Sequence, residues 1–266
     1  MPNDDLSSRR VLVTGGACGI GYAVARSLVA AGAKVAIGDI NKTELDRAAA
    51  SLKSSSLLAL PLDVTSEESV RHAVRSCVNE FGGLDTLVNS AGIIDFAPLE
   101  EVQQKTWDRV IAVDLTGVFL ACKEAAPHLR QSGRGRIVTI SSDAGKIGVG
   151  LISSYCAAKF GVIGLSKAIA AELAPYGTTV NCVCPGGVTA TQMGQKVLEW
   201  ISAKSGRSKE EIIEDREKSV PLGRMQTPED VAGAVMFLIS DAGSYITGEA
   251  INIDGGGLGT ARIRGL

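Results

Sequence analysis

Residues 9–30 of the chain read RRVLVTGGACGIGYAVARSLVA. A short apolar run leads through Gly15, Gly19 and Gly21 into a segment with helical spacing. Glycines permit a tight turn and close approach of the backbone to a phosphate, while the N-terminus of a helix offers oriented N–H groups and partial positive charge. The stretch therefore predicts the first strand, turn and helix of a nucleotide-binding fold. The glycine spacing differs from the common G-x-G-x-x-G pattern, and a glycine turn alone is also compatible with mere topology.

The same alternation of strand and helix continues along the chain. Helical patterns at 19–31, 43–53, 66–81, 104–131, 153–174 and 227–240 separate apolar runs such as KVAIGD, SLLALPLD, LDTLVNSAG, GRIVTISS, TTVNCVCPGG and AINIDGG. Strands that are buried on both faces read as continuous apolar runs. We expect a single-domain α/β fold over residues 1–266, with a doubly wound (Rossmann) sheet of about seven parallel strands and helices on both faces.

Residues 189–220 break the alternation. The segment is charged, is interrupted by Gly206 and holds no run that would make a strand. One interpretation is a solvated helical excursion without a role. We favour a substrate lid, because long insertions in compact domains are usually functional or disordered.

Composition excludes several classes of protein. The 266 residues carry a formal net charge of −2, and Lys and Arg are scattered, which argues against nucleic-acid binding. The sequence contains no run of about 18 apolar residues, so it predicts no membrane span. The N-terminus MPNDDLSSRR lacks the pattern of a secretory signal, so we expect a cytoplasmic protein.

Cysteine and histidine spacing gives no sign of a metal centre. The six cysteines form no C-x-x-C pair, and the two histidines, His72 and His128, have no partner at ligand spacing. We interpret the cysteines as reduced core thiols and expect no metal.

Two aspartates end predicted strands near the glycine turn. Asp39 lies where an acidic residue would accept hydrogen bonds from the adenosine ribose hydroxyls, and positions 38–41 hold no Lys or Arg to offset a 2′-phosphate. This pattern favours NAD. Asp63 is placed to reach the adenine amino group. Each aspartate is equally consistent with a cap on the turn that follows it.

Tyr155 and Lys159 stand one helical turn apart in YCAAK, and Ser142 precedes them. A tyrosine titrates near pH ~10 in water, and a lysine ammonium on the same helix face lowers its pKa. Acid–base catalysis on an alcohol or carbonyl then becomes possible near neutrality. The pair alone is also compatible with a solvated helix face.

With the glycine turn, NSAG at 89–92, Ser142, Tyr155-x-x-x-Lys159 and Pro185-Gly186 in this order, the chain resembles the short-chain dehydrogenase/reductase family. The resemblance implies that Tyr155 is the catalytic acid or base and that Ser142 hydrogen-bonds the substrate oxygen. It also implies that Lys159 holds the nicotinamide ribose and lowers the Tyr155 pKa. The expected cofactor contacts are Gly15, Cys18, Gly19, Ile20, Gly21, Asp39, Asp63, Val64, Asn89, Ala91, Gly92, Tyr155, Lys159, Pro185, Gly186, Val188 and Thr189.

The chain departs from the family pattern at three places. Ser90 replaces a common second Asn, and the segment after Pro185-Gly186 is one residue longer, so either Thr189 or Thr191 meets the nicotinamide carboxamide. Asp114 stands where the family has the Asn of its catalytic tetrad. In the family, this Asn is implied to relay protons from Lys159 through water to solvent. Asp accepts from a water but cannot donate as an amide does. We expect the relay to survive.

Three functions remain in competition. The first is an NAD-dependent dehydrogenase of secondary alcohols, and the length of 189–220 together with VPLGRMQTPEDVAG looks like polyol, sugar-alcohol and vicinal-diol members of the family. The second is a 3-oxoacyl or other ketone reductase, and the third is a non-catalytic nucleotide-binding regulator. The predicted helices at 104–131 and 153–174 are apolar on more than one face, which together with the resemblance predicts a homotetramer.

Overall fold

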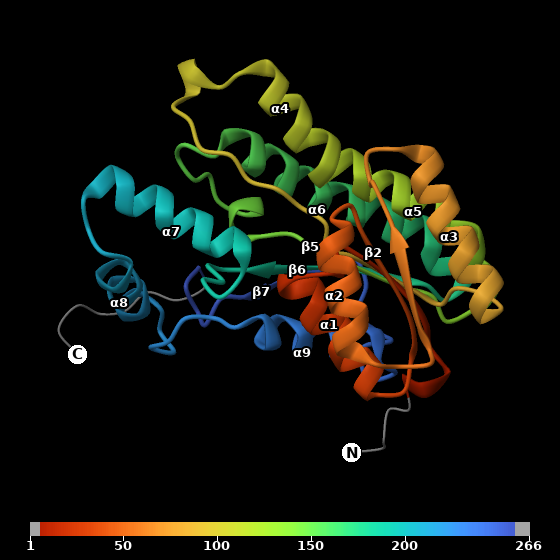
Figure 1. Ribbon diagram of the computed structural model, residues 1–266. Helices are drawn as coiled ribbons and strands as arrows, with labels where there is room; N and C mark the ends of the chain where they lie inside the picture. Colours follow the sequence, from red (N-terminus) through yellow and green to blue (C-terminus); the bar gives the residue numbers. More distant parts are fainter. Residues whose placement is uncertain (1–5, 259–266) are drawn as a thin grey trace.

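The computed structural model describes residues 6–258, in which strands and helices alternate along the chain (Figure 1). Within these residues one parallel sheet has the order β3-β2-β1-β4-β5-β6-β7. Its strands are β1 (Arg10–Thr14), β2 (Lys34–Asp39), β3 (Leu57–Pro61), β4 (Thr86–Asn89), β5 (Arg136–Ile140), β6 (Thr179–Pro185) and β7 (Ala250–Ile253). The predicted doubly wound sheet of seven strands is confirmed.

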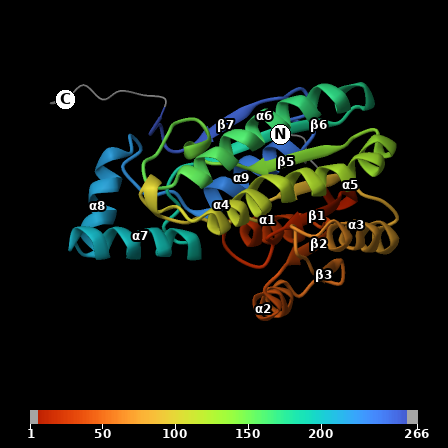
Figure 2. The same ribbon diagram turned by 90° about the horizontal axis from the view of Figure 1, so that it is seen from above.

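Helices cover both faces of the sheet (Figure 2). One layer contains α1 (Gly19–Ala30), α2 (Lys42–Leu52) and α9 (Pro228–Ile239), and the other contains α3 (Glu67–Phe81), α5 (Gly117–Ser132) and α6 (Ser153–Leu173). Alternation along β1 serves both layers, because Val11 and Val13 pack with α1 while Leu12 packs with α3. None of the helices in the described part of the chain is long and apolar enough to cross a membrane.

The predicted helix at 104–131 differs from a regular α-helix. It consists of α4 (Gln104–Ile111), a π-helical turn η3 (Ala112–Thr116) and α5, with helical backbone angles at both junctions. A π turn inserts an extra residue into the helix and is often found at functional sites. Asp114 lies in this turn and is fully buried.

Residues 189–220 contain two helices, α7 (Gln192–Ser205) and α8 (Lys209–Ser219), and no strand, as expected. Gly206 ends α7 with a φ of +71°, a conformation that suits glycine. Ser208 and Glu211 form a capping box at the start of α8. The two helices project together from one side of the molecule (Figure 1), and we call them the α7–α8 hairpin.

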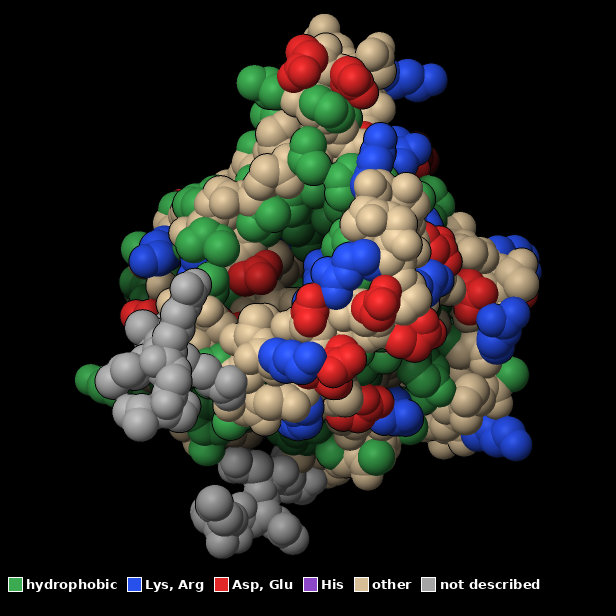
Figure 3. Space-filling model, turned by 90° about the vertical axis from the view of Figure 1, so that its left-hand side faces the viewer, with side chains coloured by type: hydrophobic (Ala, Val, Ile, Leu, Met, Phe, Trp, Pro, Cys, Tyr) green, Lys and Arg blue, Asp and Glu red, His purple; other side chains and the backbone are tan. Residues whose placement is uncertain are grey.

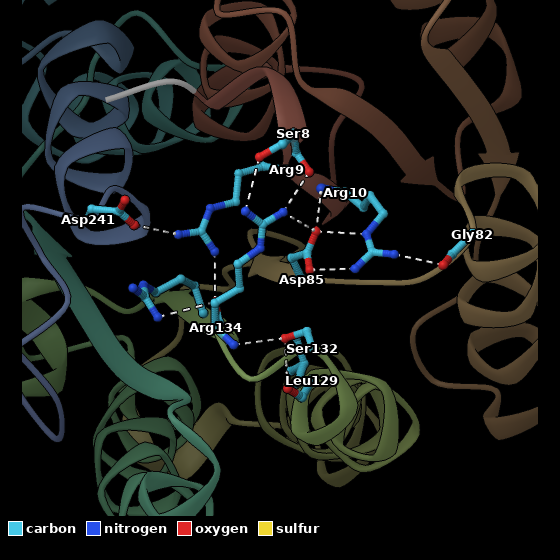
Figure 4. A network of polar contacts seen from close by, with 10 residues as sticks. Ser8, Arg9, Arg10, Gly82, Asp85, Leu129, Ser132, Arg134 and Asp241 are labelled. Atoms are coloured by element: carbon cyan, nitrogen blue, oxygen red, sulfur yellow. Dashed lines mark hydrogen bonds and ion pairs between the residues drawn. The ribbon is translucent and has the colours of Figure 1, made fainter. Parts of the chain in front are cut away.

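A network of ion pairs lies at the amino ends of the strands (Figure 4). Asp85, just before β4, has no exposed side-chain surface and accepts hydrogen bonds from Nε and Nη2 of Arg10 at 2.8 and 2.7 Å. The backbone N–H of Arg10 adds a third hydrogen bond at 3.1 Å, and Arg134 adds a fourth at 3.4 Å and also reaches Ser8. The network ties the start of β1 to the segments that lead into β4 and β5.

Candidate active site

A cavity of about 1130 Å³ opens at the carboxyl ends of the strands. Loops from both halves of a doubly wound sheet meet at this edge, where such folds bind their ligands. Seen from the side of the α7–α8 hairpin, the surface is hollowed, with hydrophobic side chains in the hollow (Figure 3). The predicted residues on its wall are Gly15, Cys18, Gly19, Ile20, Asp39, Asp63, Val64, Ala91, Gly92, Ser142, Tyr155, Lys159, Pro185, Gly186, Val188 and Thr189.

The glycine turn between β1 and α1 is packed too tightly for larger residues. A Cβ on Gly21 would lie 2.1 Å from the carbonyl oxygen of Gly15, and one on Gly15 would lie 2.7 Å from the backbone of Ala91. Gly15 also has a φ of +62°. The turn therefore presents bare backbone to the cavity beside the N-terminus of α1, which fits a pyrophosphate.

Two of the predicted cofactor residues lie behind the cavity wall. Gly21 packs against the turn, and Asn89 is buried, with its Nδ2 donating to Thr139 Oγ1 at 3.2 Å. Asn89 therefore joins β4 to β5 beneath the Ser90–Gly92 segment. In the structure both residues support the wall without facing the space that it encloses.

Both predicted adenosine-site aspartates face the cavity and also hold their own loops. Asp39 accepts hydrogen bonds from the backbone N–H groups of Ala17 at 3.3 Å and Asn41 at 3.0 Å. Asp63 accepts from the N–H and hydroxyl of Thr65 at 2.9 and 2.7 Å. At each position the aspartate can therefore cap its own turn and still face a ligand in the cavity.

Tyr155, Lys159 and Asp114 form a buried chain of charged and polar groups. The Lys159 ammonium lies 5.3 Å from the centre of the Tyr155 ring, donates to the carbonyl of Ile140 at 3.1 Å, and is 3.1 Å from Oδ2 of Asp114. The other carboxylate oxygen of Asp114 accepts from the N–H of Ile93 at 2.8 Å. Asp114 thus contacts Lys159 directly and anchors it to the loop after β4.

Burial and charge shift the pKa values of these three groups. Burial raises the pKa of Tyr155; the Lys159 ammonium opposes the rise, and Asp114 adds to it. Burial lowers the pKa of Lys159, but the Asp114 carboxylate and Tyr155 together outweigh burial and leave that pKa raised. Burial also raises the pKa of Asp114, against the pull of Lys159. The carboxylate therefore weakens the effect of the lysine on the tyrosine.

Ser142 lies between β5 and a short 3₁₀ turn, η4 (Asp143–Gly145). Its hydroxyl donates to Oδ1 of Asp143 at 2.8 Å and accepts from the N–H of Ala144 at 3.2 Å. The hydroxyl also opposes the rise in the Tyr155 pKa. Ser142 must turn away from Asp143 before it can donate to a substrate oxygen.

In the loop after β6, Thr189 and Thr191, the two candidates for the nicotinamide contact, have different roles. Thr191 caps α7: its hydroxyl donates to the carbonyl of Val188 at 2.9 Å and accepts from the N–H of Gly194 at 3.0 Å. Thr189 also lines the cavity, and its side chain does not cap this helix. The geometry favours Thr189 for the predicted nicotinamide contact.

Sequence reasoning missed the residues that close the substrate side. Trp200 of α7 stacks on Phe96 with ring centroids 5.0 Å apart and planes at 17°. Met193 and Arg216 of the α7–α8 hairpin share this wall. The only sequence signal for this wall was Trp200, a single tryptophan in a charged helical segment. That signal does not identify Phe96 as the residue on which Trp200 stacks.

All six cysteines are free thiols, and five of them are buried in the core, as expected; Cys18 is only partly buried, because it lies in the glycine turn and lines the cavity. Burial raises the pKa of Cys77, Cys122 and Cys182 to about 12 in each case. In the part of the chain between residues 6 and 258, no three His, Cys, Asp or Glu side chains are grouped in a way that could hold a metal ion.

Known proteins match the chain over nearly its whole length. A family model described as enoyl-(acyl carrier protein) reductase matches residues 15–257. The 2-(S)-hydroxypropyl-CoM dehydrogenase 3 of Xanthobacter autotrophicus is 38% identical over 253 residues, which cover 94% of this chain and 97% of that protein.

Two solved structures share the fold. Sorbitol-6-phosphate 2-dehydrogenase SrlD from Erwinia amylovora has a TM-score of 0.89 and 34% identity, over 93% of this chain and 99% of the other. A variant of actinorhodin polyketide ketoreductase, solved with NADPH, has a TM-score of 0.90 and 35% identity, over 96% and 99%. Together with the order of motifs from the glycine turn to Pro185, these matches show that the chain is an oxidoreductase of the short-chain dehydrogenase/reductase family.

Proposed function

We propose that the protein is an NAD-dependent dehydrogenase that interconverts a secondary alcohol and its ketone, with Tyr155 as the acid–base residue. One observation carries the proposal: Ser142, Tyr155 and Lys159 share a single cavity with the glycine turn and Asp39. A nucleotide held at the turn and a substrate held at Tyr155 then occupy one space.

The proton and the oxygen are handled by side chains of this chain. Bound nicotinamide supplies the hydride acceptor for oxidation and the hydride donor for reduction. In oxidation the Tyr155 phenolate takes the proton of the substrate hydroxyl, and in reduction the phenol returns it. Ser142 donates a hydrogen bond to the substrate oxygen as its charge changes. Lys159 stabilises the phenolate, and Asp114 holds Lys159 in place.

Asp39 supports the choice of NAD over NADP. Its carboxylate lines the cavity at the end of β2, where a 2′-phosphate would meet a like charge. Lys42, the nearest cation after it in sequence, is exposed and pairs with Asp46 at 3.2 Å. Neither Asp39 nor Lys42 therefore provides a free basic group for a 2′-phosphate at this end of the cavity.

The α7–α8 hairpin is proposed as the substrate lid of a single domain that spans residues 1–266. Residues from both helices line the cavity, and the Phe96–Trp200 stack joins the hairpin to the loop after β4. Lids of this kind exclude water during the reaction and open for release.

The experiment compares initial rates with NAD and NADP on polyols, vicinal diols, simple secondary alcohols and 3-oxoacyl thioesters. The proposal expects faster oxidation of alcohols with NAD and a loss of activity in Tyr155→Phe. Higher efficiency with NADP on 3-oxoacyl thioesters would favour the ketone reductase instead. Nucleotide binding without turnover of any compound would favour the regulator.

We also propose a cytoplasmic homotetramer. Phe119 of α5 and Phe160 of α6 are 45% and 47% exposed, which is unusual for aromatic side chains on neighbouring helices. Pairing of α5 and α6 with their symmetry mates would cover both rings. Six free thiols suit a reducing compartment. Light scattering tests the assembly, and a monomer would contradict it.

A further inference from the structure

Arg216 of α8 places its guanidinium on the cavity wall, against the loop that follows β6. A Cβ on Gly187 would lie 3.0 Å from Nη1 of Arg216, so the guanidinium rests against the backbone just after β6. Gly187 is flanked by Gly186 and Val188, and all three line the cavity together with Tyr155. A cation from the α7–α8 hairpin therefore reaches the wall that also holds the catalytic group.

This guanidinium is half-buried, and no carboxylate of residues 6–258 forms an ion pair with it. The acidic groups nearby on the wall have other partners: Asp230 pairs with Arg224, Asp143 accepts from Ser142, and Asp254 accepts from the N–H of Gly256. A half-buried guanidinium without a carboxylate partner attracts anions and binds them through two parallel hydrogen bonds.

Other cations on the wall are placed differently. Lys159 is paired with Asp114 and Arg224 with Asp230, while Lys196 and Arg109 are exposed. Arg216 thus combines partial burial with an open hydrogen-bonding edge. The combination suits recognition of one charged group on a ligand.

On one side of Tyr155 the cavity wall is apolar. Tyr155 packs in one cluster with Ile93, Ile94, Phe96 and Met193. These side chains suit a short hydrocarbon segment next to the reacting carbon.

We propose that the substrate is a secondary alcohol, or its ketone, with a short apolar chain that ends in an anionic group, and that Arg216 binds this anion. The inference rests on the proposed dehydrogenase function and names the substrate class for it. Carboxylate, sulfonate and phosphate groups can each accept hydrogen bonds from a guanidinium. The proposal is therefore tested by comparing substrates with a charged and an uncharged end.

The test uses two nearly isosteric ketones, 5-oxohexanoate and the uncharged 5-oxohexanamide, with a sulfonate of the same chain length as a third compound. Binding to the NADH-loaded Tyr155→Phe protein is measured by calorimetry, and kcat/KM with NADH is measured on the wild-type enzyme. The anions are expected to bind at least tenfold tighter than the amide. Arg216→Gln is expected to lower anion binding and kcat/KM about tenfold to a hundredfold and to leave the amide unchanged.

Arg207→Gln is the matched control. Arg207 lies in the same hairpin and pairs with Asp215, and it does not line the cavity. This variant removes the same charge and should keep the preference for anions, whereas Arg216→Lys should retain part of it. All three hairpin variants are checked for an unchanged melting temperature.

Three results overturn the proposal. The first is a wild-type protein that shows no preference for the anions, which includes failure to bind any of the three compounds. The second is an Arg216→Gln variant that keeps the preference. The third is an Arg216→Gln variant with a KM for NADH raised by the same factor for every substrate, which would assign the guanidinium to the cofactor. Binding that depends on Arg216 without turnover would instead contradict the dehydrogenase function and leave the anion site intact.

Discussion

Each end of the central sheet buries a carboxylate against cations, and the two clusters are built differently. At the amino end, Asp85 is fixed by several hydrogen bonds from Arg10 and by Arg134. At the carboxyl end, Asp114 meets Lys159 through one oxygen beside a large cavity. Both carboxylates have no exposed side-chain surface.

The outcome for the two carboxylates is opposite. Burial raises the pKa of Asp85, but Arg10 and Arg134 outweigh burial and leave it lowered, whereas burial dominates at Asp114 and leaves its pKa raised. Asp85 accepts several hydrogen bonds on its two oxygens, and these stabilise it as a charge. Asp114 has one partner on each oxygen and shifts the pKa values of its neighbours, Lys159 and Tyr155.

The largest expected effect is loss of activity at the carboxyl end without loss of stability. Tyr155→Phe removes the proton donor and should lower kcat/KM about 1000-fold, equivalent to ~4 kcal/mol. The melting temperature should stay at the wild-type value or rise, because a buried hydroxyl is removed. Steady-state kinetics and calorimetry measure the two quantities.

Tyr176→Phe is the matched control for this change. Tyr176 is 45% exposed, packs under Arg130 and does not line the cavity. Its loss of a hydroxyl should leave the rate unchanged. Wild-type rates in Tyr155→Phe would show that the proposed mechanism is wrong.

The amino end should show the reverse behaviour. Asp85→Ala leaves Arg10 and Arg134 without their carboxylate and should lower the free energy of unfolding by about 3 kcal/mol, the low end for a broken buried pair because both arginines reach water. Urea denaturation measures the loss, and the activity of the folded fraction should be unchanged. Asp241→Ala removes an 86% exposed partner of Arg9 and should have no measurable effect.

This contribution of Asp85 depends on pH in a definite direction. Because its pKa is lower in the folded state than the ordinary 3.8, the stabilisation is present above that value and is lost as the pH falls through the folded pKa. Asp85→Asn should therefore flatten the acid limb of the stability curve. An unchanged acid limb would contradict the role assigned to the ion pairs.

A smaller effect is expected at Asp114. Asp114→Asn should change activity by less than about tenfold, a ΔΔG‡ below ~1.4 kcal/mol. The carboxylate raises the pKa of Tyr155, so its removal should move the rising limb of the oxidation rate to lower pH. A pH–rate profile of kcat/KM measures the shift. A loss of a hundredfold or more would show that the carboxylate has a role of its own.

The smallest expected effect is on the reactivity of buried cysteines, which reports local unfolding at the amino and carboxyl ends of the sheet separately. Cys77 lies near Arg10 and Asp85, Cys182 lies near Lys159, and burial raises the pKa of each thiol to about 12. Neither should react with iodoacetamide in the native protein. Asp85→Ala should raise the rate at Cys77 relative to Cys182 a few-fold, read by mass spectrometry. Equal acceleration would mean that the ends open together.

Predictions from the sequence succeeded where local patterns carry the information. The glycine turn, the Thr227 cap of α9 and the break at Gly206 all follow from the conformations that single residues prefer. The helix at 104–131 was located correctly, but its π-helical turn was missed. No pattern of apolar residues distinguishes one extra residue inside a continuous helix.

The order of strands and helices, the nucleotide edge of the sheet and the Tyr155–Lys159 pair were determined by the sequence alone. Periodicity defines each element, and the carboxyl ends of parallel strands must meet at one edge. Only the tertiary structure decided that Asp114 contacts Lys159, that Trp200 stacks on Phe96 and that Arg216 lies against Gly187. Each of these contacts joins segments that are distant in the chain, and side-chain packing between such segments leaves no trace in the local pattern of either one.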